Sequence, residues 1–80
     1  MAFEVAMPKF GQTMEEGTIA EWVKHVGSYV AKGDLLVRIE TDKAILDVFA
    51  EESGYLLELT AMEGEVVPCG RVIALMGNEL

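Results

Sequence analysis

Six of the eight glycines in this chain form three pairs, each separated by the same 37 residues. The first members are Gly17, Gly27 and Gly33, and their mates are Gly54, Gly64 and Gly70. Apolar residues around them repeat in the same way: Ile19 aligns with Leu56, Trp22 with Leu59 and Val30 with Val67. A solenoid usually needs three or more units, so two copies indicate one closed domain. We therefore expect two similar β-layers related by a quasi-two-fold axis.

The segments between the glycines are short and rich in β-branched and aromatic residues, with turn signals about every ten residues. This pattern is typical of an all-β sandwich or barrel. Val37 and Ile39 alternate with charged residues and should point inward. Ile19 and Trp22 are instead three residues apart, and their repeat mates keep that spacing, which predicts a β-bulge in each copy.

Composition limits what the chain can do. Eighty residues, of which 51% are apolar, are enough for one small core, so we expect a single domain over residues 1–80. Fourteen acidic against six basic residues give a net charge of −8, which argues against binding to nucleic acid or to anionic membranes. Glutamates expected at turns or strand ends are candidates for steering the domain toward basic partners: Glu15, Glu16, Glu51, Glu52, Glu63 and Glu65. The single cysteine, Cys69, excludes an internal disulfide.

Lys43 lies between two β-like runs, residues 35–40 and 44–50, in a connection that contains no glycine. Two-residue hairpin loops normally use Asn-Gly, Asp-Gly or Gly-X, because the favoured turns need positive φ. Asp42-Lys43 is a poor choice for a turn alone. A position where a local rule fails is a candidate functional site, and this one would hold a primary amine in solvent on a rigid ribbon.

Catalysis by this chain finds little support in its residues. A Schiff-base lysine needs desolvation or a neighbouring cation, and an open tip beside Asp42 offers neither. His25, the only histidine, lacks the partners of a catalytic or metal site, and the five methionines show no metal-like spacing. We predict no catalytic residue and no metal ligand.

Three stretches together carry a family resemblance. Residues 7–17, Met-Pro-Lys-Phe-Gly-Gln-Thr-Met-Glu-Glu-Gly, resemble the opening of a lipoyl domain. Glu40-Thr41-Asp42-Lys43-Ala44 resembles its lipoylation site, and Gly54, Gly64 and residues 67–70 resemble its closing half. The chain is therefore similar to the lipoyl domain of the acyltransferase component of 2-oxo acid dehydrogenase complexes, and its opening favours a pyruvate- or acetoin-type complex. A cysteine at position 69, where the family usually has an aliphatic residue, leaves the fold expectation intact.

The resemblance implies a flattened barrel of two four-stranded antiparallel sheets with Lys43 at a hairpin tip. Lipoate would be amide-linked to Lys43, with Asp42 and Ala44 influencing both ligase recognition and reductive acylation. Gly27 and Gly54 would occupy turns. The decarboxylase component would recognise the loop near the lysine: Phe10, Gly11, Gln12, Thr13, Met14, Glu15 and Glu16.

The implied function is that of a swinging-arm carrier rather than an enzyme. Lipoate would be reductively acylated by the decarboxylase, pass the acyl group to CoA at the acyltransferase core, and be reoxidised by dihydrolipoamide dehydrogenase. A lipoate ligase or lipoyl transferase would be a further partner, and the isolated domain would be monomeric. The location would be a bacterial or archaeal cytoplasm, or a mitochondrial matrix.

Three alternatives remain. A biotin carrier domain shares the general fold, but it usually has Met on both sides of the lysine, where this chain has Asp42 and Ala44. The glycine-cleavage carrier protein is also lipoylated but larger. An unmodified interaction module would be indifferent to Lys43→Arg.

Overall fold

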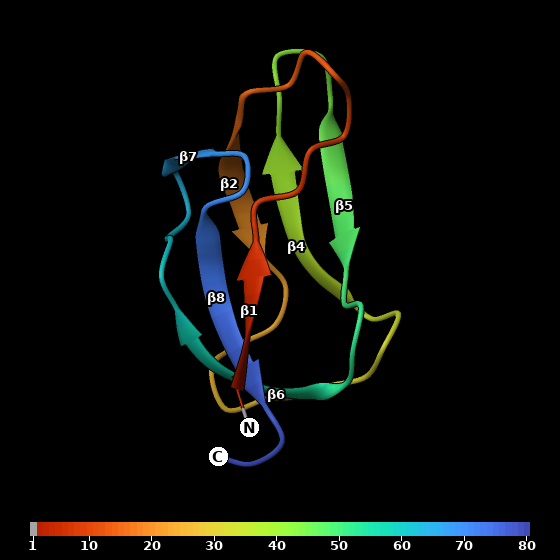
Figure 1. Cartoon of the computed structure of the whole chain (residues 1–80), viewed down its shortest axis with the longest axis vertical. Helices are drawn as coiled ribbons and strands as arrows, with labels where there is room; N and C mark the ends of the chain where they lie inside the picture. The colour runs from red at the N-terminus through yellow and green to blue at the C-terminus, as the bar shows by residue number, and fades with distance from the viewer. Residues whose placement is uncertain (1) are drawn as a thin grey trace.

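The computed structural model describes residues 2–80, and all of its regular structure is β-strand. One sheet has the order β1-β8-β6-β3 and the other the order β5-β4-β2-β7, with every pairing antiparallel (Figure 1). The strands are β1 (Ala2–Ala6), β2 (Glu16–Trp22), β3 (Tyr29–Val30), β4 (Leu35–Glu40), β5 (Ile45–Phe49), β6 (Gly54–Leu59), β7 (Val66–Pro68) and β8 (Val72–Gly77). The predicted all-β fold of two four-stranded sheets is confirmed, although the sheets do not close into a continuous barrel.

The glycine repeat corresponds to a real quasi-symmetry. Gly27 N donates to Leu56 O at 2.8 Å, and its mate Gly64 N donates to Ile19 O at 2.7 Å. In each half, therefore, the turn glycine is bonded to a strand of the other half. The strands of the two sheets correspond in the same order, with β1 matching β5, β8 matching β4, β6 matching β2 and β3 matching β7.

Both predicted β-bulges are present. The β2–β4 pairing shifts register between Ile19 and Glu21, and the β6–β8 pairing shifts between Leu56 and Glu58. The extra residue re-aims the strand, so that Ile19 and Trp22 both face the core despite their three-residue spacing.

The core lies between the two sheets. Its fully buried side chains are apolar and come from both halves: Met7, Ile19, Val30, Leu36, Val37, Ile39, Leu56, Ile73 and Met76. Trp22 is also buried, and its Nε1–H donates to Ala61 O at 2.9 Å. Cys69 is partly buried against this core, so its role as a small hydrophobe agrees with the structure.

The glycines divide into two structural kinds. Gly27 has φ +94 in the turn before β3, which confirms the predicted turn. The prediction of a turn at Gly54 is wrong, because Gly54 begins strand β6 without a positive φ. A Cβ at Gly54 would lie 2.8 Å from Gly77 O, so this glycine is required by the close approach of β6 and β8.

Candidate functional site

The site is the tip of the β4–β5 hairpin. Glu40 pairs with Ile45, so residues 41–44 form the connection. Figure 1 shows this tip at one end of the elongated molecule, with both chain termini at the other end. The molecule measures 35 Å along its longest axis, so the tip projects from the narrow end of a long body.

Thr41 closes this turn. Its backbone N–H donates to Ala44 O at 2.8 Å, and its hydroxyl donates to the same oxygen at 2.9 Å. The hydroxyl oxygen also accepts from Ala44 N at 3.1 Å and from Lys43 N at 3.3 Å. Among residues 2–80, only glycines have positive φ, so a side-chain oxygen replaces the glycine that a primed turn would need. The sequence reasoning missed Thr41, although a threonine at the start of a glycine-free turn was a usable signal.

The three central residues of the tip are open to solvent. Asp42, Lys43 and Ala44 are all exposed, and no ion pair within residues 2–80 involves Lys43. The structure thus brings Lys43 together with both of its predicted flanking residues. The exposed position of Lys43 gives its amine no desolvation within the described chain, so the arrangement favours acylation by an activated donor over Schiff-base catalysis.

The hairpin below the tip is braced on its outer face. Arg38 on β4 forms ion pairs with Glu21 on β2 at 2.8 Å and with Asp47 on β5 at 3.3 Å. A hydrogen bond to Glu21, and to a smaller extent one to Asp47, raises the pKa of Arg38 above its ordinary value. Exposed pairs contribute little stability individually, but this network links the three neighbouring strands that support the tip.

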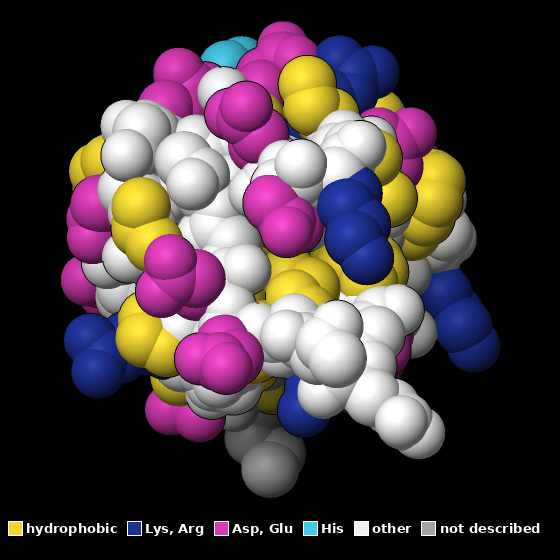
Figure 2. Space-filling model, turned by 90° about the horizontal axis from the view of Figure 1, so that it is seen from above, with side chains coloured by type: hydrophobic (Ala, Val, Ile, Leu, Met, Phe, Trp, Pro, Cys, Tyr) yellow, Lys and Arg dark blue, Asp and Glu magenta, His cyan; other side chains and the backbone are white. Residues whose placement is uncertain are grey.

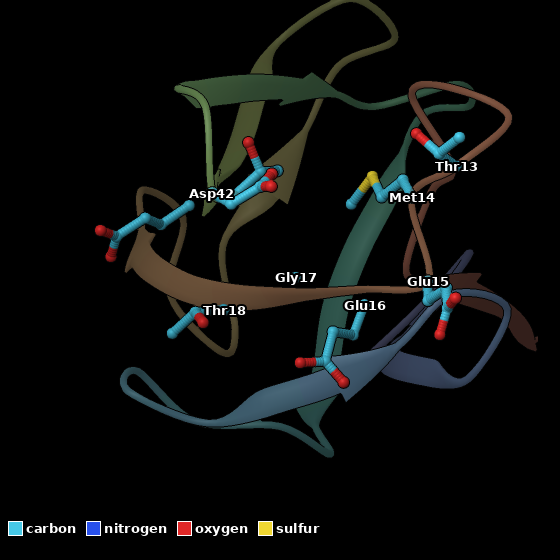
Figure 3. A pocket seen from close by; sticks show the side chains of 9 residues that line it. Thr13, Met14, Glu15, Glu16, Gly17, Thr18 and Asp42 are labelled. Carbon is cyan, nitrogen blue, oxygen red and sulfur yellow. The ribbon is translucent and has the colours of Figure 1, made fainter.

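A groove of about 600 Å³ lies beside the tip, between the strand end and the loop that precedes β2. It is lined by Thr13, Met14, Glu15, Glu16, Gly17, Thr18, Glu40, Thr41 and Asp42. In Figure 3, Met14 and Asp42 extend from opposite walls of this groove. Four of the lining residues are acidic and none is basic, and Figure 2 shows acidic side chains spread over this end of the molecule.

The predicted recognition loop is therefore split. Thr13, Met14, Glu15 and Glu16 line the groove beside the tip. Phe10, Gly11 and Gln12 do not line it, and form a separate open hollow with Lys9. The Phe10 side chain is 45% exposed, so it is available for contact with a partner.

Two of the six glutamates considered for steering have local structural contacts. Glu63 Oε2 accepts from Trp22 N at 2.9 Å, and Glu65 Oε1 accepts from Met62 N at 2.9 Å. All six are exposed, including the other four, which are Glu15, Glu16, Glu51 and Glu52. Within residues 2–80, no cluster of three or more His, Cys, Asp or Glu side chains could hold a metal ion. No helix of the described chain is long and apolar enough to cross a membrane.

Known proteins resemble the chain over nearly its whole length. The family model described as "Biotin-requiring enzyme", for biotin- and lipoyl-attachment domains, matches residues 3–76. The dihydrolipoyllysine-residue succinyltransferase component of the 2-oxoglutarate dehydrogenase complex of Staphylococcus saprophyticus is 49% identical over 75 residues. That alignment covers 94% of this chain and 18% of the relative.

A second relative and a solved structure agree with this result. The acetyltransferase component of the Corynebacterium glutamicum pyruvate dehydrogenase complex is 40% identical over 78 residues, which cover 98% of this chain and 12% of the relative. The lipoyl domain of the Azotobacter vinelandii 2-oxoglutarate dehydrogenase complex superposes with a TM-score of 0.77 at 32% identity, covering 96% of this chain and 98% of that domain. The chain thus spans less than a fifth of the two curated relatives. Because these relatives include both succinyl- and acetyltransferase components, the preference for a pyruvate- or acetoin-type complex stays a prediction.

Proposed function

Since this chain belongs to the biotin- and lipoyl-attachment family, we propose that it is a lipoyl carrier domain with its cofactor amide-linked to Lys43. The observation that carries this proposal is the exposed Lys43 between Asp42 and Ala44, at the end of a braced hairpin. Relatives and a solved lipoyl domain that belong to 2-oxo acid dehydrogenase complexes support the same reading. The parent protein would then be a dihydrolipoyl acyltransferase.

The residues at the tip fit covalent attachment. Once deprotonated, the Lys43 amine attacks the carbonyl carbon of an activated lipoyl donor. The C–N amide bond forms and the nitrogen releases a proton to solvent, while the bond to the activating group breaks with its electron pair leaving on that group. The exposed tip lets a ligase reach the amine, and the product has lost one positive charge. When bound, lipoate supplies a dithiolane that carries an acyl group and two electrons.

The body of the domain supplies position rather than catalysis. The hairpin keeps Lys43 away from the core, so a long side-chain arm can enter a partner's active site while the two sheets stay outside. The acidic groove and the exposed Phe10 lie at this end and would contact the decarboxylase component. The lipoyl-lysine arm would also enter the active sites of the acyltransferase core and of dihydrolipoamide dehydrogenase.

We also propose that the isolated domain is monomeric. The edge strands β1 and β5 carry exposed carboxylates at their central residues, Glu4 and Asp47. Antiparallel self-pairing centred on either residue would place like charges opposite each other, which opposes edge-to-edge association. The further proposals are modification by a lipoate ligase or lipoyl transferase, and a location in a bacterial or archaeal cytoplasm or a mitochondrial matrix.

Intact-mass spectrometry tests the proposed function. The 80-residue chain is incubated with ATP, lipoate and a lipoate ligase or, separately, with ATP, biotin and a biotin ligase. We expect a lipoyl mass increment that is lost in Lys43→Arg and retained in Lys32→Arg, which changes an exposed lysine of another turn. Lys43→Arg should melt like the parent, because position 43 is an exposed tip.

The other outcomes are equally informative. A biotinyl increment would assign the chain to the biotin carriers. No increment with either enzyme would favour an unmodified interaction module. Loss of folding in Lys43→Arg would contradict the assignment of Lys43 to the tip.

A further inference from the structure

We propose that Thr41 is a positioning residue for cofactor attachment, acting through its hydroxyl on the backbone of Lys43. This inference rests on the proposed function and adds a residue that does not touch the reacting amine. Its basis is the three hydrogen bonds of one hydroxyl, to Lys43 N, Ala44 N and Ala44 O.

The hydroxyl compensates for a turn that is poor in its backbone alone. Asp42 and Lys43 join two antiparallel strands without positive φ, and unprimed two-residue turns tend to splay the strands of a hairpin. The Thr41 oxygen collects the N–H groups of Lys43 and Ala44, while its own hydrogen is donated to Ala44 O. One side chain therefore fixes both peptide planes that orient the lysine stem.

Removing the hydroxyl should lower the population of the tip conformation that the ligase binds, and should leave the reactivity of the Lys43 amine unchanged. The freed N–H groups face water, so they can be solvated, and the fold can survive. If the ligase binds only one conformation of the tip, the apparent affinity of the domain for the ligase falls in proportion to the population of that conformation. The KM of the domain should rise while the maximal rate of attachment stays the same.

The test is steady-state lipoylation of the 80-residue chain by a lipoate ligase at saturating ATP and lipoate. Thr41→Val keeps the β-branched shape and removes the hydroxyl. We expect kcat/KM to fall about fivefold through KM, which corresponds to the net loss of one hydrogen bond. Thr41→Ser keeps the hydroxyl and should restore most of the rate.

Thr60→Val is the matched control. The Thr60 hydroxyl is also exposed and donates to a backbone oxygen, Val72 O, at 2.9 Å, outside the tip. The Thr60→Val substitution should leave the lipoylation rate unchanged. In addition, amide hydrogen exchange should accelerate at Lys43 and Ala44 in Thr41→Val and stay unchanged in the strands of the core.

Several results would overturn the inference. These are wild-type kinetics for Thr41→Val, an equal loss in Thr41→Ser, or the same loss in Thr60→Val. A fall in kcat without a rise in KM would also refute it, because the effect would then lie in the chemistry. Failure of the unmodified chain to accept lipoate would instead refute the proposed function, so the two failures are distinguishable.

Discussion

Replacing Gly54 with alanine should destabilise the domain by a mechanism that does not involve backbone strain. Gly54 is buried and begins β6, which lies between β3 and β8. An added Cβ would lie 2.8 Å from Gly77 O and 3.4 Å from Gly77 C. These neighbours are backbone atoms, so no side-chain rotation can relieve the contact. Since φ at Gly54 is not positive, crowding is the whole cost.

The magnitude follows from this crowding. Overpacking a well-packed region typically costs about 1–3 kcal/mol, and we take about 2 kcal/mol for a contact with fixed backbone. For a domain of this size, that lowers the melting temperature by about 8–16 °C. Thermal and urea unfolding, followed by circular dichroism and by fluorescence of the buried Trp22, measure the change.

Gly11→Ala is the control for this prediction. A Cβ at Gly11 would have nothing within 4 Å, and its φ is not positive. It should melt within about 2 °C of the parent, or slightly higher because alanine restricts the unfolded chain. If Gly54→Ala melted together with Gly11→Ala, the close approach of β6 and β8 would not be rigid and the reasoning would fail.

Two shorter predictions concern a turn and an ion pair. Gly27→Val should cost about 1–2 kcal/mol by urea unfolding, because φ +94 is unfavourable for a β-branched residue even in open space; an unchanged midpoint would refute this. Asp34 accepts a hydrogen bond from Ala31 N, which, with the nearby Lys24, holds the pKa of Asp34 below its ordinary value of 3.8. Because the pKa of Asp34 is lower in the folded state, its carboxylate contributes stability that is fully present above the unfolded-state pKa. This stability is lost as pH falls through the folded-state pKa. The stability difference between the parent and Asp34→Asn should therefore shrink below about pH 4, and a difference independent of pH would contradict the assignment.

Several features of the fold could be predicted because they occur in both halves of the chain. The glycine pairs, the three-residue spacing of Ile19 and Trp22, and the spacing of their mates each occur in both halves, so one copy checks the other. The predicted turn at Gly54 is wrong, because a glycine in sequence looks the same whether it serves a turn or a close contact between strands. The bond from Trp22 N to Glu63 joins residues 41 positions apart and leaves no local signal.

The tip lacks this redundancy. In the quasi-symmetry, the β4–β5 hairpin corresponds to β8 and β1, where the two ends of the described chain lie in place of a turn. At the 37-residue offset, Thr41, Asp42 and Lys43 align with Asn78, Glu79 and Leu80, so the residues of the tip are not repeated in the other half. Substitutions in the two sheets and substitutions at the tip should therefore affect different properties, the first the melting temperature and the second the KM of lipoylation. Gly54→Ala should lower the melting temperature while its folded fraction is lipoylated with the parent KM, and Thr41→Val should raise KM with little change in melting. If each substitution altered both quantities, the strain in the sheet would reach the turn, and the hairpin could not be treated as a rigid mount for Lys43.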